Sequence, residues 1–545
     1  MTAQPDIPTA SRPTSRATVR AVCHDLMRAL GLTTVFGNPG STELPMLRDF
    51  PEDFRYVLGL QESVVVAMAD GYAKGTGRAT LVNLHTAAGL GNAMGAIITS
   101  WHGRTPLVIT AGQQDRRQLE PEPFLSGPLV DIVRPYVKWS HQPARPEDVP
   151  SALERACHTA LQAPQGPVFL SIPMDDWDAV VPRRLPRELS YRTAPDPGAL
   201  DRVATRLAAS DRLAIVAGSD AARAGATADL VRLAERLGAD VWAEPYPAQA
   251  AFPQRHPLFQ GFLPFAQAPL AEKLVGYDVV LVVGAAVFLY YPYVPGPVVP
   301  EGCEVIQLTP DPAEAARALE GFGVTGDVGL AVEGLLDRLG DPPPEAAGGP
   351  GAATDAGPAP KPAQPLPTAF VLHTLASHLP EGSILVEEAP STKATWQEHV
   401  RIDASQSYHT TASGGLGYAM PAAVGLKLAS PERPVVCVVG EGSAMYAVQT
   451  LWSAARYGAA VTFVVMDNGH YGILKMFGDL LELGDGLPGL DVPGLDLVRL
   501  AQGFGCEAER VERAEELPGA LERALEGNRV HLLDIVVDPA RGPLV

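Results

Sequence analysis

The feature of this sequence that most constrains its fold is a repeated alternation of short apolar runs with longer amphipathic stretches. The runs are rich in valine, isoleucine and leucine, and many of them end at a glycine or a polar residue. Runs of this kind are typical of buried strands, and the amphipathic stretches between them are typical of helices. Strands that alternate with helices usually pair in parallel, so the sequence predicts an α/β fold with parallel sheets.

The predicted strands fall into three groups along the chain. They lie at residues 33–36, 81–84, 107–110 and 167–172, then at 214–217, 279–283 and 304–307, and finally at 383–386, 434–439 and 461–466. In the first group, Ser41 or Thr42 is expected to cap a helix after the first strand, and Glu62 is expected to open another helix.

At 545 residues the chain is too long for one hydrophobic core and is expected to form about three domains of ~150–200 residues. We expect a disordered tail at residues 1–16, α/β domains at 17–185, 195–340 and 368–540, and a linker at 341–367. The linker is almost entirely proline, alanine and glycine, a composition that buries too little apolar area to fold. The first and third domains have similar lengths and strand patterns, which indicates duplicated halves around a central domain.

The charge and the cysteine content argue against several classes of function. A formal net charge of −20 opposes binding to nucleic acid or to an anionic membrane, because phosphate contacts need clustered lysine and arginine. The longest apolar run, residues 279–291, is too short to cross a bilayer, and the start of the chain lacks the pattern of a secretory signal. Five scattered cysteines without a Cys-x-x-Cys pair favour reduced thiols and a cytoplasmic protein.

Two polar residues follow apolar runs in the third domain. Glu441 comes directly after one predicted strand and precedes Gly442 and Ser443, and Asn468 follows the next strand and precedes a glycine. The carboxyl ends of parallel strands meet at one edge of a sheet, so these oxygen ligands are expected to lie close together. The arrangement predicts a magnesium ion that holds a diphosphate group. The alternative is that Glu441 caps a helix and that Asn468 belongs to a plain turn.

Glu62 and His85 are the candidate reactive residues of the first domain. Glu62 is either a first-turn carboxylate favoured by the helix dipole or a buried carboxyl group that protonates a cofactor nitrogen. His85 follows a predicted strand in the segment His-Thr-Ala-Ala-Gly, where it is either a core histidine or a loop residue open to a ligand. Its place at the end of a strand favours the loop position.

Several long motifs, in matching order, resemble the thiamine-diphosphate-dependent decarboxylase superfamily and, within it, the benzoylformate decarboxylases. They lie at residues 36–41 (Phe-Gly-Asn-Pro-Gly-Ser), 49–56, 67–73, 83–89, 110–114, 414–417 and 488–495. The resemblance extends from about residue 17 to 540, except for the linker. It implies a pyrimidine-binding, a central and a diphosphate-binding domain, each with a parallel sheet. It also implies homodimers or homotetramers, in which the first domain of one subunit and the third domain of its partner form each site.

The resemblance implies a role for each candidate residue at the reactive end of the cofactor. Glu62 would contact and activate the aminopyrimidine ring of thiamine diphosphate. The carbonyl group of Gly414 would accept a hydrogen bond from that ring, and Leu416 would be the apolar wedge that keeps the cofactor bent. Ser41 and His85 would contact the substrate carboxylate and the developing alkoxide.

At the diphosphate end, the resemblance implies that Glu441, Asn468 and the main-chain oxygen of His470 hold Mg²⁺. The residues around the diphosphate would be Gly440, Gly442, Ser443, Tyr471 and Gly472. The family normally has aspartate where this chain has Glu441, and the extra methylene adds a bond of ~1.5 Å. Because magnesium requires near-octahedral ligands, weaker binding or a preference for Ca²⁺ or Mn²⁺ is a hypothesis.

A second departure lies in the central domain, where Tyr291 stands at the position of a histidine in benzoylformate decarboxylases and belongs to the candidate catalytic set. The ordinary pKa of a phenol lies ~3.5 units above that of imidazole, so at neutral pH a tyrosine can donate a hydrogen bond but seldom acts as a base. Thr410 aligns near a phenylalanine of the family's aryl pocket. The rest of the expected pocket is apolar and consists of Phe124, Leu125, Ile473, Leu474 and Phe477. An aromatic or branched 2-oxo acid is the expected substrate.

The leading hypothesis is non-oxidative decarboxylation of such a 2-oxo acid to an aldehyde and CO₂, for which the cofactor supplies the difficult chemistry. The alternative is a carboligase that forms 2-hydroxy ketones in a biosynthetic pathway. Tyr291 favours this alternative, because slower proton delivery leaves time for a second acceptor. A degenerate, non-catalytic subunit is the third and least favoured hypothesis, since Glu62, Ser41, His85, Leu416 and Asn468 are all retained.

Overall fold

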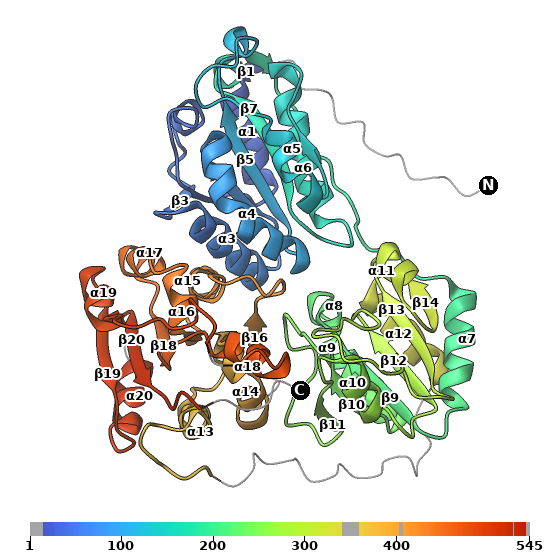
Figure 1. Cartoon of the computed structure of the whole chain (residues 1–545). Coiled ribbons are helices and arrows are strands. Elements are labelled where there is room, and N and C mark those ends of the chain that lie inside the picture. The colour runs from blue at the N-terminus through green and yellow to red at the C-terminus, as the bar shows by residue number, and fades with distance from the viewer. Residues whose placement is uncertain (1–14, 341–358, 403–406, 485, 527, 541–545) are drawn as a thin grey trace, which may run out of the picture. The chain divides into compact units, whose positions relative to one another are not determined.

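The computed structural model describes residues 15–340, 359–402, 407–484, 486–526 and 528–540. Residues 1–14 of the expected tail and 341–358 of the expected linker lie outside these ranges. The chain divides into two compact units, one of Met1–Ala73 with Arg78–Ser190 and one of Lys74–Gly77 with Tyr191–Val545. The first unit contains one six-stranded sheet and the second contains two, all of them parallel, so the predicted fold class is confirmed (Figure 1).

The sheet of the first domain has the strand order β3-β2-β4-β5-β7-β6. Its strands are β2 (Thr34–Gly37), β3 (Arg55–Leu58), β4 (Thr80–Leu84), β5 (Leu107–Gln113), β6 (Ser140–His141) and β7 (Val168–Pro173), and β1 (Arg16–Thr18) pairs separately with β8 (Val180–Pro182). The helices are α1 (Val19–Ala29), α2 (Leu44–Leu47), α3 (Glu62–Thr76), α4 (Thr86–His102), α5 (Leu129–Val133) and α6 (Val149–Leu161). Short 3-10 turns lie at η1 (Arg116–Gln118), η2 (Arg134–Tyr136), η3 (Pro146–Asp148) and η4 (Asp176–Asp178).

Helices cover both faces of this sheet, which explains why its strands are apolar on both sides. Val35 of β2 joins a buried cluster that includes residues of α1 and α6. The next residue, Phe36, points to the opposite face, where its ring centroid lies 5.3 Å from that of Tyr72 on α3. Successive residues of a strand alternate between the two faces. A strand buried on both faces therefore appears in the sequence as a continuous apolar run.

The central domain has the doubly wound strand order β11-β10-β9-β12-β13-β14. Its strands are β9 (Leu213–Ala217), β10 (Asp240–Ala243), β11 (Phe259–Phe262), β12 (Val279–Val283), β13 (Glu304–Thr309) and β14 (Phe322–Thr325). Its helices are α7 (Pro197–Ala208), α8 (Ser219–Arg223), α9 (Thr227–Leu237), α10 (Gln267–Lys273), α11 (Pro312–Arg317) and α12 (Val328–Leu339). All five residues of β12 are fully buried, as its unbroken run of valine and leucine predicts.

The third domain has the strand order β16-β15-β17-β18-β20-β19. Its strands are β15 (Ile384–Glu388), β16 (Ser407–Thr410), β17 (Val435–Gly440), β18 (Val461–Asp467), β19 (Glu507–Val511) and β20 (His531–Val536). Its helices are α13 (Thr368–His378), α14 (Lys393–His399), α15 (Ala419–Ala429), α16 (Glu441–Met445), α17 (Thr450–Tyr457), α18 (Gly472–Leu480), α19 (Leu497–Gly503) and α20 (Leu517–Glu526), with the 3-10 turn η5 (Pro390–Thr392). Numbered within each domain, the first and third sheets share the order 2-1-3-4-6-5, which supports their interpretation as related halves.

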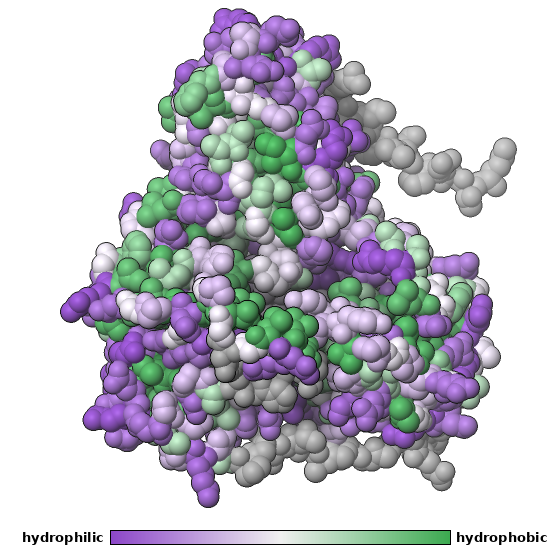
Figure 2. Space-filling view, in the orientation of Figure 1, coloured by the Kyte–Doolittle hydropathy of each residue, from purple (hydrophilic) through white to green (hydrophobic). Residues whose placement is uncertain are grey.

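Each predicted strand coincides with an observed strand. None of the helices in the described ranges combines the length and the apolar character that a bilayer crossing requires. On the face drawn in Figure 2, hydrophobic side chains lie in small groups among hydrophilic ones.

The core of the third domain begins inside the expected linker. Leu366 is fully buried and forms an isolated bridge with Val537, and its carbonyl oxygen accepts a hydrogen bond from the amide of Asp538 at 2.8 Å. Its side chain belongs to the same buried cluster as Trp396. The last residues of this proline-rich segment are therefore part of the folded domain.

We expect the substitution Leu366→Ala to destabilise the third domain by ~2–4 kcal/mol, because it removes fully buried methyl groups and leaves a cavity. Denaturant unfolding followed by tryptophan fluorescence measures the loss, with the buried Trp396 as a reporter in the same cluster. Leu319→Ala is the matched control, since Leu319 is 65% exposed and its removal should change stability by less than ~0.5 kcal/mol. Equal effects of the two substitutions would contradict the assignment of Leu366 to the core.

Candidate active site

Glu62 begins helix α3, and its carboxylate is held from two sides within the first domain. The residue is only 9% exposed. Asn38, in the loop after β2, donates its side-chain amide to Oε1 at 3.1 Å, and Asn92 of α4 donates to Oε2 at 3.1 Å. Sequence reasoning identified Glu62 but missed both asparagines, because their contacts join positions 24 and 30 residues apart.

His85 is the N-cap residue of helix α4, directly after strand β4. Its Nδ1 lies 2.8 Å from Oε2 of Glu43, a residue that sequence reasoning missed. The side chain of His85 is 21% exposed, whereas that of Glu43 is 1% exposed. Ser41 lies two residues before Glu43 and is exposed. The structure thus brings His85 and the loop that carries Ser41 together around one buried carboxylate.

The predicted helix cap at Ser41 or Thr42 is wrong. Helix α2 begins at Leu44, its N-cap residue is Glu43, and no side chain forms a capping hydrogen bond there. The hydroxyl group of Thr42 donates to Oε1 of Glu43 at 2.7 Å instead. An ionised carboxylate is a stronger acceptor than a neutral oxygen, so it determines where this hydroxyl points.

Glu441 and Asn468 lie at the ends of the adjacent parallel strands β17 and β18, in which Gly440 pairs with Met466. Glu441 is 2% exposed, and its Oε1 has no hydrogen-bond partner within the described residues. Burial raises the pKa of Glu441 to about 7, the charge of Asp467 adds to this, and the backbone amides of Asn468 and His470 lower it in part. The structure therefore places Glu441 beside the backbone of Asn468, as the strand-end pattern predicts, and beside the backbone of His470, which the resemblance adds to the set.

The residues expected around the diphosphate lie at the starts of two helices, α16 and α18. The ring of Tyr471, the N-cap residue of this helix, lies so close to Gly442 that a Cβ atom there would be 2.5 Å from it. Gly472 is the first residue of the helix, and Ser443 is nearly buried. The first amide groups of a helix lack partners within it and favour negative charge, as a diphosphate would supply.

A buried carboxylate also holds the loop that carries Gly414 and Leu416. Glu388, the last residue of β15, accepts hydrogen bonds from the backbone amides of Gly417 at 2.6 Å, Tyr418 at 2.8 Å and Ala419 at 2.6 Å. Burial raises the pKa of Glu388 to about 7, against the opposing effect of these three amides. Gly414 itself has φ +71°, a conformation that L side chains rarely adopt. Glu388 fixes the end of the loop directly after Leu416, and sequence reasoning missed it.

An apolar wall forms between the central and third domains within the second unit. The ring centroids of Tyr291 and Phe477 lie 5.1 Å apart, and Leu474, on the same helix as Phe477, is 45% exposed. The carbonyl oxygen of Tyr291 accepts a hydrogen bond from the hydroxyl of Tyr246 at 2.7 Å, which fixes this segment. Ile473 is half-buried on the same helix.

The other expected pocket residues have different surroundings. Thr410 is buried, and its hydroxyl group donates to the backbone oxygen of Glu387 at 2.7 Å, so it is directed into the third domain. Phe124 and Leu125 belong to the first unit, where Phe124 is 87% exposed and Leu125 has φ +67°.

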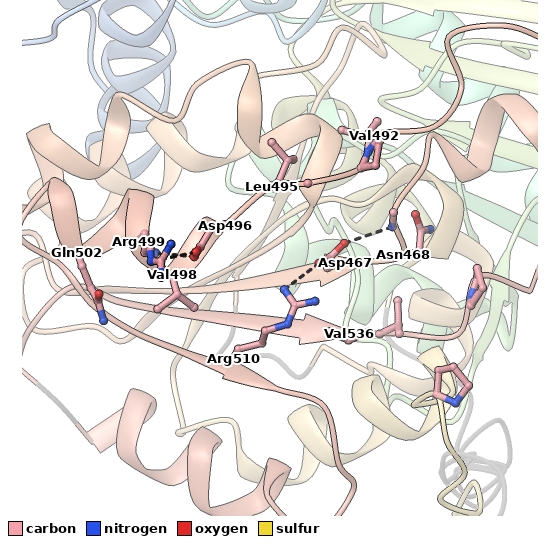
Figure 3. Close-up of a pocket in the computed structure, with 16 residues that line it drawn as sticks. Asp467, Asn468, Val492, Leu495, Asp496, Val498, Arg499, Gln502, Arg510 and Val536 are labelled. Atoms are coloured by element: carbon pink, nitrogen blue, oxygen red, sulfur yellow. Dashed lines mark hydrogen bonds and ion pairs between the residues drawn. The ribbon is translucent and has the colours of Figure 1, made fainter.

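A cavity of about 860 Å³ adjoins the expected cation site at Asn468 (Figure 3). Of the expected site residues, only Asn468 lines it. Its charged side chains pair with one another: Arg510 lies 3.3 Å from Asp467, and Arg499 lies 3.3 Å from Asp496 (Figure 3). The candidate residues therefore lie in separate clusters, around Glu62 and His85 in the first unit and around Glu441 in the second, and not around this cavity.

Models of thiamine pyrophosphate enzymes match three stretches of the chain. The N-terminal TPP-binding domain matches residues 17–133, the central domain matches 200–335 and the C-terminal TPP-binding domain matches 391–535. The chain belongs to the thiamine pyrophosphate enzyme family.

Within this family, the chain is similar to several decarboxylases that are named for benzoylformate or 4-hydroxybenzoylformate. A benzoylformate decarboxylase from Pseudomonas aeruginosa is 45% identical over 528 residues, which cover 95% of this chain and 98% of that protein. The crystal structure of benzoylformate decarboxylase from Polynucleobacter necessarius matches with a TM-score of 0.93 and 42% identity over 96% of this chain and 99% of that chain. A 4-hydroxybenzoylformate decarboxylase from Rhodococcus jostii matches with a TM-score of 0.92 and 42% identity over 96% of this chain and 100% of that chain. The resemblance inferred from the motifs is confirmed.

The residues fit thiamine diphosphate with a divalent cation. The buried Oε1 of Glu441, which has no partner among the described residues, is the oxygen that a cation would satisfy. No group of three His, Cys, Asp or Glu side chains in the described ranges could hold a metal alone. One carboxylate, one amide and one main-chain oxygen suit an ion that also binds a diphosphate, because Mg²⁺ commonly shares its coordination between protein and phosphate oxygens.

We expect Glu441→Gln to weaken Mg²⁺-dependent binding of thiamine diphosphate by ~10-fold or more, because it removes the only carboxylate of the expected set. Quenching of intrinsic fluorescence during titration of the apoprotein measures binding without any turnover. Glu398→Gln is the matched control in the same domain, since the Glu398 side chain is 70% exposed. Unchanged affinity in Glu441→Gln, or binding that needs no divalent ion, would overturn the cation assignment.

Proposed function

We propose that this protein uses thiamine diphosphate and a divalent cation to decarboxylate an aromatic 2-oxo acid to an aldehyde and CO₂. The observation that carries the proposal is the buried carboxylate of Glu62, which two amide groups hold in a fixed orientation. A carboxyl group in this setting can hold or release a proton at a fixed point next to a cofactor nitrogen. The relatives named above act, by their names, on benzoylformate or 4-hydroxybenzoylformate.

In the proposed mechanism the protein binds the cofactor and the substrate, orients them toward each other and excludes water. Glu441, Asn468 and the main-chain oxygen of His470 would hold the cation, and the loop fixed by Glu388 would present Leu416 to the cofactor. Thiamine diphosphate, when bound, supplies a nucleophilic carbon and accepts the electron pair that loss of CO₂ releases. Ser41 and His85 bind the substrate carboxylate and the oxygen of the reacting carbonyl.

The substrate class follows from the apolar wall. Tyr291 and Phe477 present aromatic surface next to Leu474, and an aryl group can pack against such surface by stacking or edge contact. Loss of CO₂ disperses charge, so a site lined by apolar side chains favours it. A branched aliphatic 2-oxo acid could fill the same space, but it would lack the aromatic contact.

We expect CO₂ release from benzoylformate with a kcat/KM ~10-fold or more above that for a branched aliphatic 2-oxo acid, because an aromatic pair contributes ~0.5–1.5 kcal/mol beyond area burial and the aryl group buries more area. The holoenzyme is assayed with Mg²⁺ and thiamine diphosphate over a panel of both substrate classes.

Glu62→Gln should lower the rate of CO₂ release ~100-fold or more while leaving the protein folded. No CO₂ release from any member of the panel would refute the proposed function.

A carboligase is the second candidate, and Tyr291 is the observation that favours it. The benzoylformate decarboxylases have a second active-site histidine at the corresponding position, so a phenol there can slow proton delivery and leave time for an added aldehyde to react. The same assay with an added aldehyde distinguishes the two functions through the products. A 2-hydroxy ketone as the main product, reverting to aldehyde in Tyr291→His, would establish the carboligase.

We also propose that each site needs two copies of the chain, paired as a dimer or as a dimer of dimers. Glu62 belongs to the first unit and Glu441 to the second, and the resemblance to the family implies that they meet across a subunit interface.

We propose the cytoplasm as the place of action. Five cysteines, all within the described residues, are free thiols, as a reducing compartment favours.

Subunit sharing predicts complementation between two inactive variants. In a C2 dimer that combines a Glu62→Gln chain with a Glu441→Gln chain, one site receives both substitutions and the other receives neither. Random pairing should therefore restore roughly a quarter of wild-type activity, as half of the dimers are mixed and half of their sites are intact. Co-expression of the two variants measures this in the unfractionated population. Mixed dimers purified through two different affinity tags should retain roughly half of wild-type activity, because one of their two sites is intact. Sites built within a single chain would show no recovery.

A further inference from the structure

We infer that Glu43 is a positioning residue that holds His85 in one tautomer, with Nδ1 protonated and Nε2 left to face the substrate. The inference rests on the proposed function, in which His85 contacts the substrate. It concerns Nε2 of His85 and the carboxylate of Glu43, neither of which sequence reasoning identified. The hydrogen bonds that surround Glu43 all lie within the first domain.

Glu43 is 1% exposed and accepts hydrogen bonds at both carboxylate oxygens. Oε1 lies 2.8 Å from the backbone nitrogen of Gly112 and 2.7 Å from the hydroxyl oxygen of Thr42. Oε2 lies 2.8 Å from the backbone nitrogen of Gly40 and 2.8 Å from Nδ1 of His85. The same carboxylate therefore contacts the loop that carries Ser41, the end of strand β5 and the imidazole.

The donors and acceptors in this cluster leave one role for Nδ1. Two partners of Glu43 are backbone N–H groups, which can only donate, and the single hydrogen of the Thr42 hydroxyl also points at the carboxylate. An ionised carboxylate only accepts, so Nδ1 of His85 must supply the hydrogen in the fourth contact. The hydroxyl oxygen of Thr42, 3.2 Å from Nδ1, can accept from the same N–H.

Close packing keeps the ring in this orientation. A Cβ atom at Gly40 would lie 2.2 Å from Nδ1 of His85, and one at Gly112 would lie 2.3 Å from Oε1 of Glu43. The backbone at Gly40 and at Gly112 therefore lies so close to the Glu43–His85 pair that only glycine fits at these positions. The residue after His85, Thr86, has φ +44°, an unfavourable conformation for a β-branched side chain that persists only where the surroundings enforce it.

The consequence is that the reacting nitrogen of His85 is Nε2. In the neutral ring Nε2 carries a lone pair and can accept a proton or a hydrogen bond, whereas in the charged ring it donates. Glu43 also fixes Gly40, which directly precedes Ser41, so a single group sets the positions of both substrate-facing residues.

The kinetic test uses the holoenzyme and a double-mutant cycle. Glu43→Gln should lower kcat for benzoylformate by ~100-fold or more, because a carboxamide can donate to Nδ1 and so stabilise the opposite tautomer. In the His85→Ala background, the same substitution should change kcat less than about threefold, because its effect passes through the imidazole. A loss of equal size in both backgrounds, or a Glu43→Gln enzyme within threefold of wild type, would overturn the inference.

Glu154→Gln is the matched control for burial of a carboxylate in the same domain. Glu154 is fully buried and accepts from the backbone amide of Arg187 at 2.6 Å and the guanidinium of Arg184 at 2.5 Å, apart from the Ser41 loop and His85. This variant should keep the kcat of wild type even if its unfolding temperature falls. The affinity for thiamine diphosphate, measured by fluorescence, should be the same in the four proteins of the double-mutant cycle and in Glu154→Gln. Equal affinity separates a positioning effect on kcat from loss of the holoenzyme.

Solid-state ¹⁵N NMR of histidine-labelled protein reads the tautomer without turnover, with His85→Ala as the assignment control. At a pH where the ring is neutral, the signal of His85 should show a protonated Nδ1 and a bare Nε2. The opposite tautomer refutes the inference, whatever the Glu43→Gln variant does. Wild-type protein that shows this tautomer but releases no CO₂ from any 2-oxo acid would refute the proposed function alone.

Discussion

Four of the buried glutamates in the first and third domains belong to the candidate clusters, and the arrangement of these clusters depends on which groups replace the water around each carboxylate. Burial of an unpaired carboxylate is costly unless donors or a cation replace the water. Glu62 receives two side-chain amides, and Glu388 receives three backbone amides. Glu43 receives two backbone amides, a hydroxyl and an imidazole. Glu441 retains one oxygen without a partner among the described residues, and this oxygen marks the place for an ion.

Both sheets place a buried glutamate near the strand numbered 1 in the order 2-1-3-4-6-5, and each of these glutamates accepts hydrogen bonds from backbone amides. Glu43 does so after β2 and Glu388 at the end of β15. Ser41 follows Gly40, which Glu43 holds, and Leu416 precedes Gly417, which Glu388 holds. In each domain, a buried carboxylate therefore fixes the loop that carries a candidate residue. The central domain, whose sheet has the order 3-2-1-4-5-6, contributes Tyr291, which contacts Phe477 of the third domain in the apolar wall.

The ten predicted strands were recognisable because strands covered on both faces leave continuous apolar runs, as in β12. Strands with exposed residues, such as β19, leave no such run and were missed. Glu62, His85, Glu441 and Asn468 were recognisable because each stands at the edge of such a run. Glu43, Asn38, Asn92 and Glu388 were not, because their partners are set by folding: Gly112, for example, is 69 residues from Glu43. The same reason explains the incorrect helix cap, since nothing local shows that the hydroxyl of Thr42 meets a buried carboxylate. Thr410 was placed by alignment, which gives no sign of its bond to Glu387.

The exposure of the apolar wall bears on how the specificity of this enzyme could be redesigned. Leu474 and Tyr291 are 45% and 60% exposed in the single chain, so replacing either should open little void in a packed interior. The neighbourhood of Glu43 offers no such freedom, because its surrounding backbone has no room for even a methyl group. Libraries for new substrates should therefore vary the aromatic side and leave the glycine-lined cradle of the imidazole intact. Evolution of this chain toward other 2-oxo acids would face the same asymmetry.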